Sequence, residues 1–119
     1  MRALSVRQPW AQAILDGIKR VENRTWKTSY RGQLVIHASK TVDDVILPGL
    51  ANPSPQGWAT GAHVGTVHLV GIHVAGRGCG EHCAHWGLPG VWHWELANPC
   101  RLSVPVLARG YPGLFPVVL

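Results

Sequence analysis

The sequence predicts an α+β fold that is mostly β and barrel-like, and three observations indicate it. Short runs rich in β-branched residues recur along the chain, as is typical of strands. Helical periodicity is confined to one or two short segments. The longest β-branched run, residues 63–75, contains Gly65 and Gly71. Glycines inside a strand often mark the bends at which a sheet curls into a barrel.

Length and composition indicate one globular domain over residues 1–119. The chain can bury a core but is too short for two domains, and 46% of its residues are hydrophobic. No apolar run approaches the roughly 18 residues of a membrane span, and the N-terminus lacks the apolar stretch of a signal peptide. Three cysteines, an odd number, argue against a disulfide framework. We expect a cytoplasmic protein with no membrane partner, and a monomer is favoured.

The first expected elements are a strand at residues 3–6 and a helix after it. Pro9 fits the first helical turn, where its missing N–H group leaves no partner unsatisfied. Gly17 is suited to end the helix. Residues 21–25 and 32–38 then have extended patterns. One face of the helix gathers apolar side chains at helical spacing: Trp10, Ala13, Ile14 and Ile18.

Later in the chain, strands are expected to alternate with irregular segments. Residues 63–75 and 91–97 are predicted strands, and the second places Trp92, Trp94 and Leu96 on one face. Residues 102–107 are predicted to form a further strand, which Pro105 places at a sheet edge.

Two segments rich in proline and glycine are predicted to be irregular. Residues 41–62 indicate a long excursion with at most one helical turn, near residues 43–47. Residues 76–90 indicate a loop for the same reason.

The positive charge of the chain is concentrated in its first third. Residues 1–40 hold eight basic and two acidic residues, a net charge of +6, whereas the remainder has a net charge of −1. An uneven basic field is the electrostatic pattern expected of a protein that binds polyanions. A basic surface that serves only solubility is the alternative.

Residues 19–24 form a dense group of charges in a chain that is only 14% charged. If this segment is extended, Val21 turns to the core, while Glu22 and Arg24 share the opposite face roughly 7 Å apart. Lys19 can approach them from the end of the helix. The carboxylate should stay ionised beside these cations, and the lysine could have a lowered pKa suited to nucleophilic or proton-transfer chemistry. An ion-pair network that braces the helix against the sheet is the alternative.

Aromatic side chains lie close to these charges in the sequence. Nucleobases stack on such rings with about 1–3 kcal/mol for each base. Trp26 and Trp58, in polar or loop contexts, are the better candidates for stacking, with Tyr30 among the basic residues. Trp10 belongs to the core face of the helix and is expected to pack there.

A second group of reactive side chains lies in residues 79–85. Four of its side chains are of types that bind zinc, with Cys100 as a spare: Cys79, His82, Cys83 and His85. Their spacing is loose, and no second pair stands at the separation found in zinc fingers. We therefore expect a loop with incidental cysteines, and neither a metal nor a cofactor.

Residues 17–24, Gly-Ile-Lys-Arg-Val-Glu-Asn-Arg, match the pattern G-x-K-x-x-E-x-R. The chain thereby resembles the ASCH superfamily (activating signal cointegrator homology), of which this pattern is the signature. The resemblance is to small bacterial members, covers nearly the whole chain and is weakest at residues 41–62. Further stretches that carry it are residues 4–10, 26–32, 34–40, 92–96 and 109–115.

The resemblance implies a PUA-like mixed β-barrel of about five to six strands with one or two short helices, in which the signature lines a cleft beside the barrel. Such folds are associated with recognition of RNA or modified nucleosides. Some members look like nucleic-acid-binding modules, some cleave RNA, and some are amidohydrolases that remove the acyl group from N4-acetylcytidine.

In those amidohydrolases the signature lysine and a threonine act with a later glutamate. Lys19 matches the lysine, but Glu22 stands where they have the threonine. Glu95 is a candidate for the later glutamate, because it lies on the non-core face of its predicted strand.

Three functions are therefore considered, and a binding module is favoured because no second catalytic group can be placed. The module would bind RNA, a nucleoside or a nucleotide. An enzyme acting on a nucleoside amide or a phosphodiester would use Lys19 as nucleophile or oxyanion stabiliser and Glu22 as general acid or base. A protein-interaction domain is the third possibility. The residues expected to contact nucleic acid are Lys19, Arg24, Trp26, Lys27, Tyr30, Arg31 and Lys40.

Overall fold

A computed structural model describes residues 1–47, 49–50, 57–75 and 80–117. Six strands form one mixed sheet in the order β2-β5-β4-β3-β1-β6, in which only β1 and β3 are parallel neighbours. The strands are β1 (Arg2–Gln8), β2 (Val21–Arg24), β3 (Gly32–Val42), β4 (Ala62–Val74), β5 (Trp92–Leu107) and β6 (Leu114–Pro116). The helices are α1 (Trp10–Leu15) and α2 (Glu81–Trp86).

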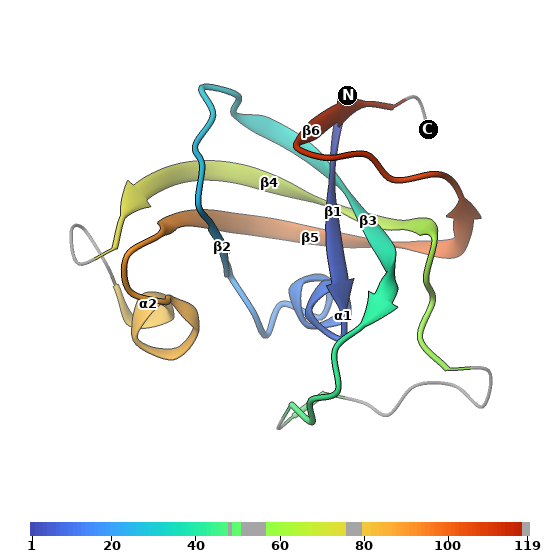
Figure 1. The fold of residues 1–119 in the computed structure, drawn as a ribbon, viewed down its shortest axis with the longest axis horizontal. Coiled ribbons are helices and arrows are strands. Elements are labelled where there is room, and N and C mark those ends of the chain that lie inside the picture. The colour runs from blue at the N-terminus through green and yellow to red at the C-terminus, as the bar shows by residue number, and fades with distance from the viewer. Residues whose placement is uncertain (48, 51–56, 76–79, 118–119) are drawn as a thin grey trace.

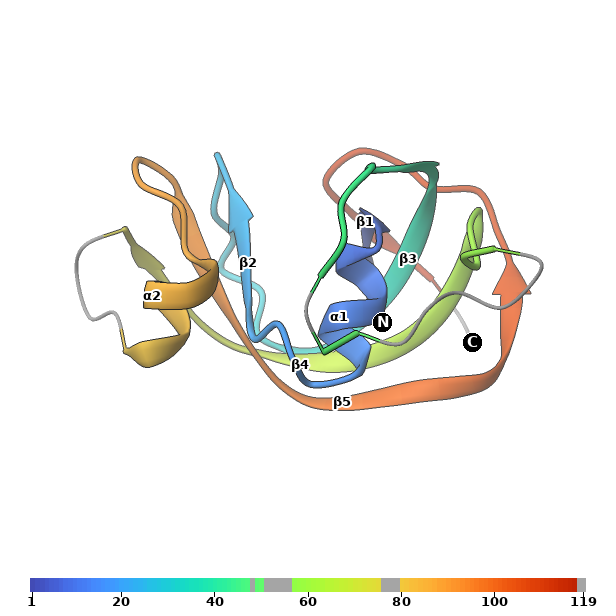
Figure 2. The same cartoon turned by 90° about the horizontal axis from the view of Figure 1, so that it is seen from below.

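The sheet bends into a trough, and α1 lies inside it between β2 on one side and β1 and β3 on the other (Figure 1, Figure 2). This confirms the α+β class with six strands and two short helices. The sheet is curved but open, since β2 and β6 are its two edges in the described part of the chain.

Helix α1 is short because its ends are set by local interactions. The side-chain oxygen of Gln8 accepts a hydrogen bond from the backbone N–H of Gln12 at 2.9 Å, which satisfies a donor in the first turn. Gly17 has a φ of +76°, the left-handed conformation expected just past a helix end. The predicted helix is therefore confirmed, with Leu15 as its last residue.

Close contact between α1 and the sheet depends on Gly65 in β4. A Cβ atom at this position would lie 2.6 Å from the Leu15 side chain and 2.6 Å from the carbonyl oxygen of Cys100. The glycine thus lets the helix lie directly on β4. The buried core fills this contact layer: Leu4, Val6, Ile14, Leu34, Ile36, Val67, Leu69 and Trp94.

Strand β5 corrects the prediction of two separate strands at residues 91–97 and 102–107. It is one strand of 16 residues, with Asn98 at a φ of 52° near its middle and three register shifts against β4. These irregularities let a single strand follow the curve of the sheet. Pro105 lies in the half of β5 that pairs only with β4, so its predicted place at an edge is confirmed.

One local prediction is wrong, because helix α2 occupies part of residues 76–90, where a loop was expected. Residues 43–47, where at most one helical turn was expected, contain none. Helix α2 has only six residues and no side-chain cap at its start, so the usual sequence signals for a helix are missing. Among the described residues, neither helix has the length and apolar composition needed to cross a membrane.

Candidate functional site

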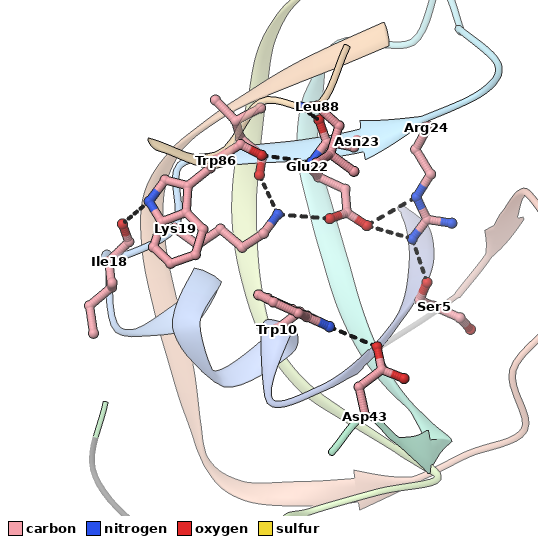
Figure 3. A network of polar contacts seen from close by, with 11 residues as sticks. Ser5, Trp10, Ile18, Lys19, Glu22, Asn23, Arg24, Asp43, Trp86 and Leu88 are labelled. Atoms are coloured by element: carbon pink, nitrogen blue, oxygen red, sulfur yellow. Dashed lines mark hydrogen bonds and ion pairs between the residues drawn. The ribbon is translucent and has the colours of Figure 1, made fainter. Parts of the chain in front are cut away.

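The signature residues form a buried group of three charges between α1 and β2 (Figure 3). Lys19 Nζ lies 3.0 Å from Glu22 Oε1, and Arg24 Nη2 lies 2.8 Å from Glu22 Oε2. Arg24 Nε also donates to Oε2 at 3.0 Å. Lys19 and Glu22 are only 4% and 8% exposed, so their charges interact largely shielded from water. We call these three residues the charged triad.

Backbone geometry brings the triad together. The turn after α1 is held by the N–H groups of Ile18 and Lys19, which both donate to the carbonyl of Ala13 at 3.0 Å. Strand β2 then starts, and its alternation places Glu22 and Arg24 on one face. In the register with β5, Glu22 lies opposite Trp94, so this is the inner face of the trough.

The carboxylate of the triad is held in its ionised form. Burial raises the pKa of Glu22, but the nearby charges of Lys19 and Arg24 and their hydrogen bonds lower it further, so the pKa lies below its usual value. Lys19 Nζ also donates to the Val21 carbonyl, and Arg24 Nη2 donates to the Ser5 carbonyl at 2.7 Å. The triad therefore carries one net positive charge in a fixed arrangement.

A pocket of about 470 Å³ opens beside Lys19 and Glu22. Two half-buried tryptophans, Trp10 of α1 and Trp86 of α2, form part of its wall, with ring centroids 6.5 Å apart and planes at 82°. The Trp86 indole N–H donates to the Ile18 carbonyl at 3.0 Å, which fixes the ring over the end of α1 (Figure 3). We call this the Lys19 pocket.

The Asn23 side chain attaches the wall formed by α2 to β2. Asn23 Nδ2 donates to the Trp86 carbonyl at 2.8 Å, and Asn23 Oδ1 accepts the N–H of Leu88 at 2.8 Å. Both donor and acceptor of the amide are thus used to hold the turn after α2. Asn23 shapes the Lys19 pocket by this contact.

A second pocket adjoins the Lys19 pocket, and a third adjoins the second. The second, of about 360 Å³, shares Trp10 and Glu22 with the Lys19 pocket and is also lined by Arg24, which gives it the name Arg24 pocket. The third, of about 930 Å³, shares Ser5 and Ser39 with the Arg24 pocket and contains Lys40 and Arg109; we call it the Lys40 pocket. Because neighbours share lining residues, the three pockets lie next to one another in a row, and we call this row the groove.

The middle of this groove is braced by Asp43. Its carboxylate accepts the Trp10 indole N–H at 2.8 Å and lies 3.2 Å from Arg7 Nη1. The hydrogen bond from Trp10 lowers the pKa of Asp43, and Arg7 adds to this effect. Trp10 therefore has a fixed ring plane, although part of it packs against the core as the helical pattern predicts.

The structure brings together four of the predicted site residues and separates the others. Lys19, Glu22, Arg24 and Lys40 line the groove. Glu95 lies on the other face of β5, paired with His73 at 3.5 Å and remote from Glu22 by strand alternation.

The remaining four predicted residues do not line these three pockets. The Trp26 ring meets Trp94 edge-on at 4.8 Å, and Lys27 Nζ lies 4.8 Å from the Trp92 ring centroid. The Tyr30 hydroxyl donates to the Gln33 carbonyl. Arg31 donates to backbone carbonyls of its own turn. These four residues lie in the connection between β2 and β3.

Several groove residues are missing from the sequence-based prediction. Trp86 and Arg109 come from segments that meet the signature only in the folded chain, so no local pattern identifies them. Asn23 lies inside the signature, at a position that the pattern leaves open. Trp10 is predicted from its helical spacing as a packing residue, and only the folded structure shows that its indole N–H donates to Asp43 beside the pocket.

The predicted metal-binding group is only partly represented in the structure. Cys79 and the side chain of His82 lie outside the described residues. His85 lines the Lys19 pocket and Cys100 is exposed on β5. Cys83 is buried, with His73 Nε2 3.2 Å and His93 Nδ1 3.3 Å from its sulfur. The histidines of this cluster come from β4 and β5.

The curved mixed sheet with a short helix in its hollow is a PUA-like fold. The sequence matches the profile of the ASCH domain over residues 4–106, and the chain belongs to this family. ZmASCH from Zymomonas mobilis, known from the crystal structure of a mutant protein, has a similar fold. The TM-score is 0.56 over 89% of this chain and 74% of that one, at 16% identity.

Two curated relatives share shorter stretches of sequence. Human activating signal cointegrator 1 is 47% identical over 53 residues, which cover 44% of this chain and 7% of that protein. The mouse protein of the same name is 56% identical over 36 residues, 30% of this chain and 6% of its own length. The chain thus matches less than a tenth of either relative.

Proposed function

We propose that this ASCH domain binds RNA, or a nucleotide of the same chemistry, in the groove formed by the three adjoining pockets. The observation that carries the proposal is the succession of three adjacent pockets, from the Lys19 pocket, past the charged triad, to the Lys40 pocket. A row of pockets suits a ligand with several phosphates and bases better than a small compact one.

Charge along the groove favours an anionic ligand. Its lining includes five cations and two carboxylates, and both carboxylates are already paired with cations. Lysine and arginine neutralise phosphates and release their counterions, which is the main source of affinity in nucleic-acid binding. The cations are Arg7, Lys19, Arg24, Lys40 and Arg109.

The Lys19 pocket has the chemistry needed for a nucleobase. Its volume of about 470 Å³ lies within the range of small-ligand sites. Trp10 and Trp86 offer aromatic surface for stacking, worth about 1–3 kcal/mol for each base. Glu22, ionised and accepting only, can receive a hydrogen bond from an exocyclic amino group, as carboxylates do with cytosine.

Ser39 supplies an unused polar group along the same path. Its hydroxyl oxygen is buried, and no hydrogen-bond partner is found for it within the described part of the chain. It lines both the Arg24 pocket and the Lys40 pocket. A buried polar atom of this kind needs a partner, and rotation of the side chain toward the groove would let a sugar or phosphate group supply one.

Binding of a labelled single-stranded RNA, measured by fluorescence anisotropy at several salt concentrations, tests this proposal. We expect affinity to fall steeply with salt, and Lys40→Ala to weaken binding and reduce the salt slope by about one. Arg31→Ala is the matched control, because it also removes one exposed cation but lies outside the three pockets. Equal losses in both variants, or no binding at low salt, would rule out the groove.

An amidohydrolase acting on a modified nucleoside is the second candidate, favoured by the Lys19 side chain beside the pocket. Its Nζ donates to Glu22 and Val21 and could stabilise a developing oxyanion. The lowered pKa of Glu22 disfavours it as a general acid. Chromatography of N4-acetylcytidine incubated with wild type and Lys19→Ala tests this candidate. Deacetylation by wild type alone would support it, and no product from either would exclude this substrate.

A further inference from the structure

We propose that His73, Cys83 and His93 bind a zinc ion that attaches α2 to the adjacent ends of β4 and β5. The three ligand atoms lie within 4.8 Å of one another. They come from three elements, and α2 lies beside the end of β4 and the beginning of β5 (Figure 1, Figure 2). The proposal is independent of what the groove binds.

The spacing of the ligand atoms fits a tetrahedral zinc ion. Cys83 Sγ lies 3.2 Å from His73 Nε2 and 3.3 Å from His93 Nδ1. Zinc binds sulfur at about 2.3 Å and imidazole nitrogen at about 2.0–2.1 Å, so tetrahedral ligands stand roughly 3.5 Å apart. A small movement of the side chains would therefore admit the ion.

Each imidazole is oriented as in known zinc sites. His93 Nε2 lies 2.7 Å from the Leu88 carbonyl oxygen, and His73 Nδ1 lies 3.5 Å from Glu95 Oε2. Zinc-binding histidines almost always donate their second ring nitrogen to a carbonyl or a carboxylate, which directs the other lone pair to the metal. Both outer partners are present here, and both inner nitrogens face the same sulfur.

The protons of these three side chains can be accounted for when a cation binds. The Cys83 thiol carries one hydrogen, and a ring nitrogen of each histidine faces its sulfur. When zinc binds, the thiol releases this proton, and the thiolate and both nitrogen lone pairs bond to the metal. The rest of the coordination sphere is left to water or to a further side chain.

The donor set favours zinc over copper. One thiolate with two imidazoles suits either metal, but blue-copper sites typically add an axial methionine. The only methionine of the chain is Met1, whose backbone pairs with Val117 next to β6. Zinc in a site of protein ligands is therefore the better match.

A zinc ion here would support the wall of the Lys19 pocket. Helix α2 has only six residues, and so short a helix is not stable by itself. Zinc binding contributes directly to folding in sites of this kind. The ion would hold Cys83 against the sheet and thereby fix Trp86, three residues later, over the end of α1.

Titration of the full chain with Co²⁺, followed by the thiolate-to-cobalt charge-transfer band and by competition with Zn²⁺, tests the site. We expect one metal per chain, loss of the band in Cys83→Ser, and its retention in Cys100→Ser, the exposed-cysteine control. A wild-type chain without the band, a band that survives in Cys83→Ser, or displacement by copper but not zinc would overturn the proposal.

A second variant covers the case in which Cys83→Ser fails to fold. Glu95 is partly exposed and its replacement keeps all three ligands, so Glu95→Gln should fold normally by circular dichroism. Loss of an outer partner should lower zinc affinity about 10–100-fold. Unchanged affinity in this variant would contradict the assignment of His73 as a ligand oriented by Glu95.

Discussion

At the scale of single residues, Glu22 is the position on which the site depends. It is a buried carboxylate between two cations, and its oxygens are bonded to both. A buried ion pair is a poor source of stability compared with apolar packing, yet removing one partner is strongly destabilising. Apolar packing would stabilise this position at least as well, which agrees with the use of the triad in the groove that we propose.

Glu22→Gln should destabilise the fold at neutral pH by about 3 kcal/mol, because Lys19 and Arg24 then lack their counter-charge. The pKa of Glu22 in the folded chain lies below the unfolded value of 4.5. Its contribution is therefore fully present above that pH and is lost as the pH falls through the folded pKa. The difference from wild type should shrink in acid, as urea unfolding at neutral and acidic pH would show.

Asp44→Asn is the control for this experiment, since Asp44 is an exposed carboxylate on the segment after β3. Its effect should stay within about 0.5 kcal/mol. If Glu22→Gln were as stable as wild type at neutral pH, the triad would not be a tightly coupled ion group.

Sequence patterns identify the triad because its three members are close in the chain and their spacing is set by β2. The family signature and the period of a strand are both local properties. Trp86 and Arg109 are different, because their places in the groove depend on contacts with distant segments. The charges of residues 26–31 lie outside the three pockets, since Lys27 lies over Trp92 and Arg31 binds the backbone of its own turn.

At the scale of secondary structure, the contact of α1 with β4 fixes the trough. Gly65→Ala would place a methyl group 2.6 Å from both Leu15 and the Cys100 carbonyl. Overpacking of this kind typically costs about 1–3 kcal/mol. We expect the urea midpoint to fall accordingly.

Gly80→Ala is a suitable comparison for Gly65→Ala. A Cβ atom at Gly80 meets nothing within 4 Å, and its φ of −96° is accessible to alanine. Its cost, that of a less favourable residue at the start of α2, should be about 1 kcal/mol or less. A larger loss at Gly80 than at Gly65 would contradict the close helix–sheet contact.

The attachment of α2 to β2 gives a second prediction at this scale. Asn23→Ala removes both hydrogen bonds to the turn after α2, each worth about 1 kcal/mol. The amide of Leu88 should then exchange with solvent faster, while amides in β3 should not change. Hydrogen exchange measured by NMR would show this, and unchanged protection of Leu88 would mean that another contact holds the turn.

Most of the strands can be predicted from the sequence, because alternation and β-branched runs report burial on one face. Trp92 and Trp94 illustrate this, since their period of two matches the inner face of β5. The continuity of β5 cannot be predicted in this way. Asn98 and Pro99 look like a break between strands, and only pairing with β4 on both sides of them shows otherwise.

At the scale of the whole molecule, the open trough explains why the groove exists. The concave face of the sheet holds α1, and the charged triad lies where the helix gives way to β2. The last residues of β3 and the segment after β5 add Lys40 and Arg109 to the third pocket. Several of the basic residues that the sequence concentrates in its first third thus come to line neighbouring pockets only in the folded, curved sheet.

The tryptophans offer a way to locate the ligand on the folded molecule. Six indole N–H signals should be visible by NMR, one for each tryptophan. Titration with single-stranded RNA at low salt should shift those of Trp10 and Trp86 and leave that of the fully buried Trp94 unchanged. Shifts confined to Trp26 and Trp92, or no shifts at all, would contradict binding in the groove.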